Sequence, residues 1–130
     1  MLKYQLRTAM LMTLISGSAF AQAGPFQYSC SNIGFGIDDN QPALTAVCRT
    51  DDGKFKPSSL ILQGISNVNG SLAQGEGKST FQETCGNIQV LVDGPYVSLS
   101  AICRTEKGEY GSTSLSLTGI TNNDGKLSAP

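Results

Sequence analysis

The chain has 130 residues, with nine lysines and arginines, ten aspartates and glutamates, and no histidine, which gives a formal net charge of −1. The length fits a single domain. The absence of histidine excludes histidine-based acid–base catalysis and serine–histidine triads.

The first 21 residues have the features of a secretory signal sequence. Lys3 and Arg7 supply a positive start, a short apolar run follows, and small residues at Ala19 and Ala21 precede the expected cleavage site. The apolar run is too short to span a bilayer and no later stretch is longer, so we expect no membrane insertion. Cleavage after Ala21 leaves 109 of the 130 residues, 22–130, as one secreted, extracellular domain. Loss of Lys3 and Arg7 lowers the net charge from −1 to −3, which argues against a nucleic-acid partner.

The second part of this domain repeats the first. Residues 26–73 align with residues 81–128 at a constant offset of 55 positions without a gap, and 20 of the 48 aligned positions are identical. Average residue usage would make about one position in twenty identical by chance. The alignment leaves 73–80 (AQGEGKST) as the connector, and it predicts a pseudo-twofold molecule in which a site in one repeat recurs in the other.

Alternating apolar and polar residues predict β-strands with one buried face in both repeats. In chain order the alternation covers residues 44–48, 60–62, 97–103 and 114–117. Ile88 to Val92 is a more continuous apolar run, for which we expect a strand that is buried on both faces. No part of the domain has a sustained helical period, so we predict an all-β fold with short helical turns near 57–59 and 112–113.

Turn residues occur at matching positions of the two repeats. Asn69-Gly70 and Asp124-Gly125 are strong signals for two-residue hairpins, because both central residues of such turns need a positive φ. A second pair of turns is expected at 52–53 and 107–108, where glycine follows aspartate or lysine.

The connector 73–80 is polar and rich in glycine, so we expect it to be mobile. A monomer is expected, and a domain-swapped dimer is the alternative that such a connector allows. Asn69-Gly70-Ser71 also fits an N-glycosylation acceptor, and the sequence does not decide between this role and the turn.

Four cysteines in an exported chain indicate two disulfides, for which the sequence permits three connectivities. The repeat favours the symmetric pairing, Cys30 with Cys48 and Cys85 with Cys103. Each bridge would close a short loop and contribute about 3 kcal/mol in the chain-entropy model. Structural zinc is the rival interpretation, but the chain has no C-x-x-C pair and no histidine, so we expect neither a metal nor another cofactor.

These features together resemble the cyanovirin-N homology (CVNH) lectins. The resemblance covers nearly the whole domain in order. Its carriers are Phe-x-x-x-Cys at 26–30 and 81–85, Leu-x-Ala-x-Cys-x-Thr at 44–50 and 99–105, an aromatic residue at Phe55 and Tyr110, and the hairpin segments 67–72 and 122–127.

The resemblance implies an elongated all-β protein of two pseudosymmetric halves, each with one disulfide and each mixing strands from both repeats. It also implies a protein without catalytic activity or metal that binds mannose-rich oligosaccharides, especially terminal α1,2-linked mannose, or the glycoproteins that carry them. Up to two sites would lie near the two ends.

The resemblance places each site where three segments meet: the stretch before a first cysteine, the stretch after a second cysteine, and the end of the other repeat. One set of candidate carbohydrate-binding residues is Tyr28, Ser29, Arg49, Thr50, Asp51, Thr121, Asn122 and Asp124. The other is Ser66, Asn67, Asn69, Thr80, Glu83, Thr84, Arg104, Thr105 and Glu106.

The chemistry of these sets suits a sugar, because a sugar hydroxyl both donates and accepts hydrogen bonds. Both sets combine carboxylates, amides, hydroxyls and an arginine, whereas stacking on a sugar face is left to Tyr28 because the chain has no tryptophan. Purely structural roles are the alternative. Arg49 and Arg104 would then form exposed ion pairs with the acidic residues two positions later, and Asn67 and Asn122 would only shape the hairpins.

Two other classes of function are alternatives to a lectin. Glycoside hydrolysis needs two facing carboxylates, but 38–39 and 51–52 are sequence neighbours, which point to opposite faces of a strand. A secreted protein-binding or structural module on the same fold is the second alternative, and it would use exposed apolar residues such as those in the Phe35 loop. If the protein is a lectin, Asn122→Ala or Thr105→Ala is expected to abolish binding with little change in stability.

Overall fold

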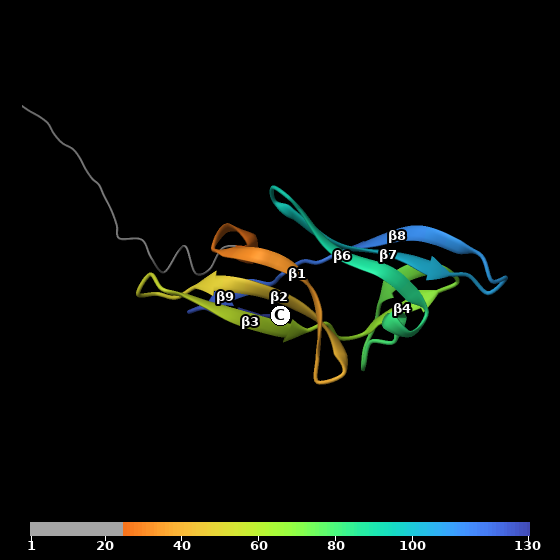
Figure 1. Ribbon diagram of the computed structural model, residues 1–130, viewed down its shortest axis with the longest axis horizontal. Coiled ribbons are helices and arrows are strands. Elements are labelled where there is room, and N and C mark those ends of the chain that lie inside the picture. The colour runs from red at the N-terminus through yellow and green to blue at the C-terminus, as the bar shows by residue number, and fades with distance from the viewer. Residues whose placement is uncertain (1–24) are drawn as a thin grey trace, which may run out of the picture.

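The computed structural model describes residues 25–130, which form an elongated molecule of two three-stranded antiparallel sheets and two separate hairpins (Figure 1). The predicted signal sequence and residues 22–24 lie outside the described residues. The first sheet has the order β1-β2-β3, with β1 Cys30–Asp38, β2 Gln41–Arg49 and β3 Phe55–Ile61. The second has the order β6-β7-β8, with β6 Cys85–Asp93, β7 Tyr96–Arg104 and β8 Tyr110–Ser116. Each sheet comes from one repeat, and the all-β, tandem-repeat prediction is confirmed.

The two hairpins exchange between the repeats. They consist of β4 Ile65–Val68 with β5 Ser71–Gln74, and of β9 Thr121–Asn123 with β10 Lys126–Ser128. Strand β10 packs on β3 of the first repeat, and Leu127 N–H donates to Ser58 Oγ at 2.9 Å. Strand β5 packs on β8 of the second repeat, where Leu72 N–H donates to Thr113 Oγ1 at 3.1 Å. We call β1–β3 with β9–β10 the first half, and β6–β8 with β4–β5 the second half.

Two short 3₁₀ turns precede the first cysteine of each repeat, η2 Phe26–Tyr28 and η3 Phe81–Glu83. Phe26 and Phe81 are buried and anchor these turns in the core. The helical turns predicted near 57–59 and 112–113 are wrong, because these residues lie within β3 and β8. Pro57 is tolerated there because β3 is the edge strand of its sheet, where a missing N–H does not break the ladder.

The core follows the alternation expected in the middle strands β2 and β7. Leu44 and Ala46 are buried from β2, and Leu99 and Ala101 are buried from β7. The expectation that Ile88 to Val92 is buried on both faces is wrong. Strand β6 has a hydrogen-bonded neighbour on one side only, and its hairpin with β7 projects from the sheet (Figure 1), so Leu91 is 48% and Val92 is 45% exposed.

The disulfides have the symmetric pairing, Cys30–Cys48 and Cys85–Cys103, which confirms the pairing inferred from the repeat. Each bridge joins residues that lie directly opposite each other on the first two strands of its sheet. All four cysteines are therefore used. Within residues 25–130 no helix has the length and apolarity needed to cross a bilayer.

The hairpin turns are as predicted, whereas both ends of the connector, which we expected to be mobile, make contacts with the rest of the fold. Asn69-Gly70 and Asp124-Gly125 each have positive φ at both positions, as a two-residue turn with a right-handed twist requires. Strand β5 continues to Gln74, and Ser79 is buried near the other end of the connector. The Ser79 hydroxyl donates to Leu62 O at 2.5 Å and accepts from Ile65 N–H at 2.9 Å. These bonds hold the end of the connector against the second half.

Candidate binding sites at the two ends

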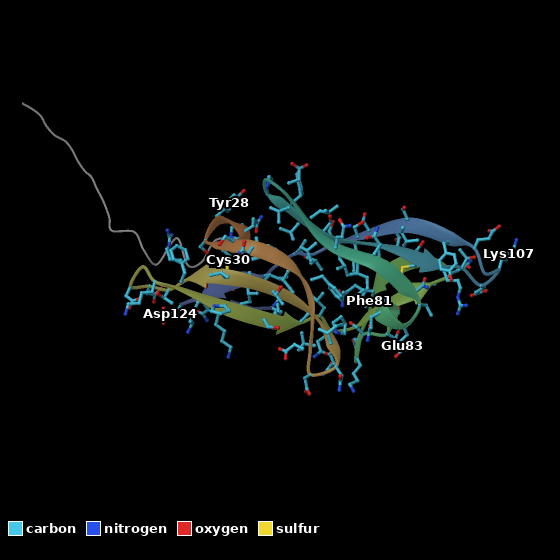
Figure 2. All side chains as sticks on the ribbon, in the orientation of Figure 1. Tyr28, Cys30, Phe81, Glu83, Lys107 and Asp124 are labelled. Atoms are coloured by element: carbon cyan, nitrogen blue, oxygen red, sulfur yellow. A yellow bond between two sulfur atoms is a disulfide. The ribbon has the colours of Figure 1, made fainter. Side chains whose placement is uncertain are left out.

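At each end of the molecule, the loop after a second cysteine is tied to the turn of a hairpin from the other repeat. In the first half, Asp51 N–H donates to Asp124 Oδ1 at 2.8 Å. In the second half, Glu106 N–H donates to Asn69 Oδ1 at 2.9 Å. Figure 2 shows Asp124 near one end of the molecule and Lys107 at the other. The structure therefore brings together the loop and turn segments of both predicted sets.

Asn122 lies beneath the first site and joins its three segments. Its Nδ2 donates to Ser29 Oγ and to Arg49 O, both at 2.9 Å, and its Oδ1 accepts from Gly125 N–H at 2.8 Å. Asn122 has no exposed surface and Ser29 is also buried, so neither side chain can contact a ligand directly without local opening. Both side chains therefore lie beneath the surface predicted to bind sugar. The contacts of Asn122 fit the alternative role, in which it shapes the hairpin.

Asn67 makes the equivalent contacts in the second half. Its Nδ2 donates to Thr84 Oγ1 at 2.8 Å and to Arg104 O at 2.9 Å, and its Oδ1 accepts from Gly70 N–H at 2.7 Å. Asn67 is half-buried rather than fully buried. The same three-way junction is therefore more open to water in the second half.

The loop after β2 is closed by Thr50 in the first half. The Thr50 hydroxyl donates to the Asp52 carboxylate and accepts from Lys54 N–H at 3.0 Å. The bond from Thr50 is the main reason that the pKa of Asp52 lies below its ordinary value of 3.8, and backbone N–H groups add to this effect. The Lys54 ammonium lies 4.0 Å from Asp52, in an exposed pair that contributes little to stability.

The loop after β7 is closed by Thr105 in a similar way. Glu109 N–H donates to Thr105 Oγ1 at 3.1 Å, and Thr105 N–H donates to Glu109 O at 2.7 Å. Lys107 stands where the first half has Asp52, so the threonine has no carboxylate partner at that position. The two ends thus share a backbone frame but differ in the charges that they present.

The two arginines are exposed and available to a ligand. Their backbone N–H groups are fixed to the turns η2 and η3, through Ser29 O at 2.9 Å for Arg49 and Thr84 O at 3.1 Å for Arg104. Within the described part of the chain, neither guanidinium forms an ion pair, and the pairs with Asp51 and Glu106 that were considered as an alternative are not made.

A hollow of about 440 Å³ opens at the end of the first half. Three predicted residues line it, Thr50, Asp51 and Asp124, together with four that were not predicted: Asp52, Lys54, Phe55 and Lys56. The signal that could have found Phe55 is its register, because a tight 52–53 turn between two strands places it directly opposite Arg49.

The remaining predicted residues are not gathered in that hollow. Tyr28 is 64% exposed on η2, and Thr121 lines a separate hollow of about 310 Å³ beside Phe26 and Pro95. In the second half, Thr80 and Glu83 are exposed around η3, and Figure 2 shows Glu83 on the side of the molecule rather than at its tip. Ser66 is half-buried on β4.

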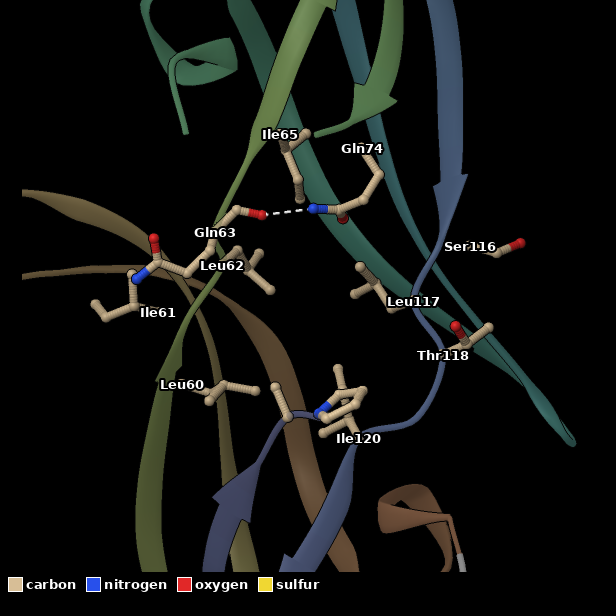
Figure 3. Close-up of a pocket in the computed structure, with 12 residues that line it drawn as sticks. Leu60, Ile61, Leu62, Gln63, Ile65, Gln74, Ser116, Leu117, Thr118 and Ile120 are labelled. Carbon is tan, nitrogen blue, oxygen red and sulfur yellow. Dashed lines mark hydrogen bonds between the residues drawn. The ribbon is translucent and has the colours of Figure 1, made fainter. Parts of the chain in front are cut away.

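A further hollow of about 500 Å³ lies at the waist, where the chain crosses between the halves (Figure 3). Its walls combine apolar side chains, such as Leu60 and Ile120, with uncharged polar ones, and Gln74 Nε2 donates to Gln63 O at 2.7 Å. It shares no residue with either predicted set. No charged side chain lines it, whereas aspartates and lysines line the hollow at the end of the first half. Charged groups make the stronger hydrogen bonds to hydroxyls, so the ends remain the candidate sites.

The fold and the end loops define a class: a tandem-repeat β protein with exchanged hairpins and a polar loop cluster at each end. The family model of the CVNH domain matches residues 26–128. The chain therefore belongs to the CVNH family.

Solved structures show the same relationship, whereas no curated protein sequence matches the chain. Microvirin, solved in complex with mannobiose, has 33% sequence identity to this chain and a TM-score of 0.62. The match covers 82% of this chain and 99% of microvirin. NcCVNH of N. crassa is 26% identical, with a TM-score of 0.62 and coverage of 80% and 96%. A MoCVNH3 variant in complex with (N-GlcNAc)4 is 21% identical, with a TM-score of 0.62 and coverage of 84% and 99%, and supports the fold alone.

Proposed function

We propose that the protein is a secreted lectin that binds mannose-rich oligosaccharides, with terminal α1,2-linked mannose as the preferred unit. Each end would hold one site, so that a monomer binds up to two glycans. The observation that carries this proposal is the loop–turn junction found at both ends, where the loop after a second cysteine is hydrogen-bonded to a hairpin turn of the other repeat.

The chemistry of the first end supports a neutral sugar. Asp51 and Asp124 offer acceptors, and Lys54 and Lys56 offer donors. The hydrogen bond from Asp51 N–H to the Asp124 carboxylate fixes the geometry before a ligand arrives. Preorganised groups lose less conformational entropy on binding, so a small ligand can be held by few contacts. Microvirin, to which this chain is 33% identical, has been solved with mannobiose, and this favours mannose over other hexoses.

Binding without catalysis fits the side chains that are present. Within residues 25–130, no group of three or more Cys, Asp or Glu side chains is arranged to hold a metal ion, and both pairs of cysteines are oxidised. We assign no reaction and no cofactor to the protein, and we take the monomer as its functional state.

The direct test is calorimetric titration of the oxidised mature protein, 22–130, with α1,2-mannobiose. Galactose and chitin oligomers are the controls. Heat with mannobiose alone, at a stoichiometry of one or two, is the expected result. Binding only to chitin oligomers would move the specificity to N-acetylglucosamine, and no heat with any sugar would contradict the lectin assignment.

One feature favours a protein-binding role as the second candidate. In the Phe35 loop, the Phe35 ring packs edge-on against Phe81 with centroids 6.2 Å apart, whereas Ile37 is 60% exposed, as expected for this loop. The tip of the β6–β7 hairpin adds a larger exposed apolar group, made of Leu91, Val92 and Tyr96. If no sugar binds, this tip is the surface to vary in a search for protein partners.

Export is the remaining part of the proposal. The signal-like sequence and the two disulfides support it, because disulfides persist in oxidising compartments. Mass spectrometry of the protein recovered from the medium of its host is expected to give an N-terminus at Gln22. Retention inside the cell with Met1 intact would contradict export.

A further inference from the structure

An exposed aromatic ring begins the third strand of each sheet. Phe55 is 62% exposed at the start of β3, and Tyr110 is 68% exposed at the start of β8. Phe55 lies directly opposite Arg49 in the β2–β3 ladder, and Tyr110 lies directly opposite Arg104 in the β7–β8 ladder. Residues opposite each other in a ladder project from the same face, so each ring stands beside the exposed arginine of its end.

The position of Phe55 is unusual among the phenylalanines of the described residues. Phe26 and Phe81 are buried, and Phe35 is partly buried against Phe81. A single exposed apolar side chain is common on protein surfaces and needs no explanation by itself. Phe55, however, lines the 440 Å³ hollow that also contains Asp51 and Asp124. An apolar ring and hydrogen-bonding carboxylates therefore share one concave surface.

This combination matches the two-sided chemistry of a pyranose. One face of a hexopyranose is made of C–H groups and packs favourably on the electron-rich face of an aromatic ring. Its edge carries hydroxyl groups, which donate to carboxylates and accept from ammonium groups. Asp51 and Asp124 provide the acceptors, and Lys54 and Lys56, the chain neighbours of Phe55, provide donors in the same hollow.

We propose that Phe55 is the stacking platform of the first-end site, on which a pyranose ring packs while its hydroxyls bond to Asp51 and Asp124. The proposal rests on the lectin function proposed above and adds a contact residue and the ring face that is recognised. It also makes the ends unequal. In the second half, Tyr110 retains the ring, but Glu109 and Gly111 replace the two lysines and remove their donors.

The test measures binding at each end separately by ¹H–¹⁵N NMR titration of the mature, oxidised protein with α1,2-mannobiose. The amides of Asp51 and Glu106 report the first and second ends, because each bonds to the hairpin turn of its own site. The variants are Phe55→Ala, Phe55→Tyr, which keeps the ring, and Phe55→Leu, which keeps apolar area without it. Tyr110→Ala is the matched variant at the opposite end. Far-UV circular dichroism and melting curves check that each variant folds.

We expect Phe55→Ala to raise the dissociation constant at the first end by about 5- to 10-fold, the size of one aromatic contact, with no change at the second end. Phe55→Tyr should remain within about 2-fold of the unmodified protein, and Phe55→Leu should lie between it and alanine. Tyr110→Ala should leave the first end unchanged. An unchanged first-end constant in folded Phe55→Ala would overturn the stacking role while leaving the lectin function intact. No mannobiose-dependent shift in the unmodified protein would instead remove both proposals.

Discussion

Replacement of Asn122 by alanine removes the side chain that joins the three segments of the first half. Asn122 is fully buried and makes three hydrogen bonds, to Ser29 Oγ, Arg49 O and Gly125 N–H. Each such bond contributes about 1 kcal/mol to stability, so the substitution is expected to lower the free energy of unfolding by about 3 kcal/mol. This contradicts the expectation from sequence that Asn122→Ala would spare stability.

The repeat provides a matched control in Asn67→Ala. Asn67 makes the same three bonds in the second half, but it is half-buried, so water can replace part of what is lost. We expect Asn67→Ala to cost about 1 to 2 kcal/mol, less than its buried counterpart. Urea unfolding with both disulfides intact, followed by tyrosine fluorescence because the chain has no tryptophan, measures both values.

The difference in unfolding free energy between Asn122→Ala and Asn67→Ala is a sharper test of the effect of burial than either value alone. If burial decides the cost, Asn122→Ala must be the more destabilising variant by at least about 1 kcal/mol. It should also weaken sugar binding at the first end only, because the loop and the turn would no longer be held together. Equal costs for the two variants, or an Asn122→Ala protein as stable as the unmodified one, would refute the positioning role.

Two further predictions concern the loop and turn of the first half. Gly125→Ala is expected to lower the free energy of unfolding in urea by about 2 to 3 kcal/mol, because φ is +87° and the new Cβ would lie 2.8 Å from Thr50 Cγ2. Gly53→Ala is the control, since its φ is +85° but nothing lies within 4 Å of the new Cβ, and it should cost about 1 kcal/mol. Equal losses in the two variants would argue against the contact with Thr50. Thr50→Val should raise the pKa of Asp52 toward 3.8 in a carboxyl NMR titration, because it removes the main bond to that carboxylate, and an unchanged midpoint would contradict this. Since the folded-state pKa is depressed, the stabilisation from Asp52 is fully present above pH 3.8 and is lost as the pH falls through the folded-state value.

Much of the fold follows from local patterns that a duplicated sequence shows twice. The alternation around Leu44 and Leu99 gives the buried middle strands, and the Asn69-Gly70 and Asp124-Gly125 pairs give the hairpin turns. The symmetric disulfides follow from the constant spacing of the cysteines in each repeat. These features depend on residues close together in the chain, which is why the sequence suffices for them.

The sequence did not predict the exposure of β6 or the different burial of the two asparagines. Both depend on which strand lies at the edge of a sheet and on which segments pack over it. The apolar run ending in Leu91 and Val92 resembles a buried strand, but β6 is an edge strand and its tip has no cover. Asn122 and Asn67 occupy equivalent positions in the repeat, yet only Asn122 is fully buried. Burial of this kind is set by packing across the whole half, and a single sequence does not record it.

The sequence predicted which segments of the chain form the candidate sites, but not which of their side chains share one surface. Asp51 and Asp124 are 73 residues apart, and only the exchange of hairpins between repeats brings them together. Phe55 was noted as part of the family resemblance but not as a site residue, since its place opposite Arg49 depends on the register of β2 and β3.

A crystal structure of the mature protein, 22–130, with α1,2-mannobiose tests the central claim most directly. We predict a sugar ring in the hollow lined by Asp51, Asp124 and Phe55, and a second ring at the equivalent position beside Glu106 and Asn69 if both ends bind. Sugar bound only in the hollow at the waist, or no sugar at either end at saturating concentration, would contradict this prediction.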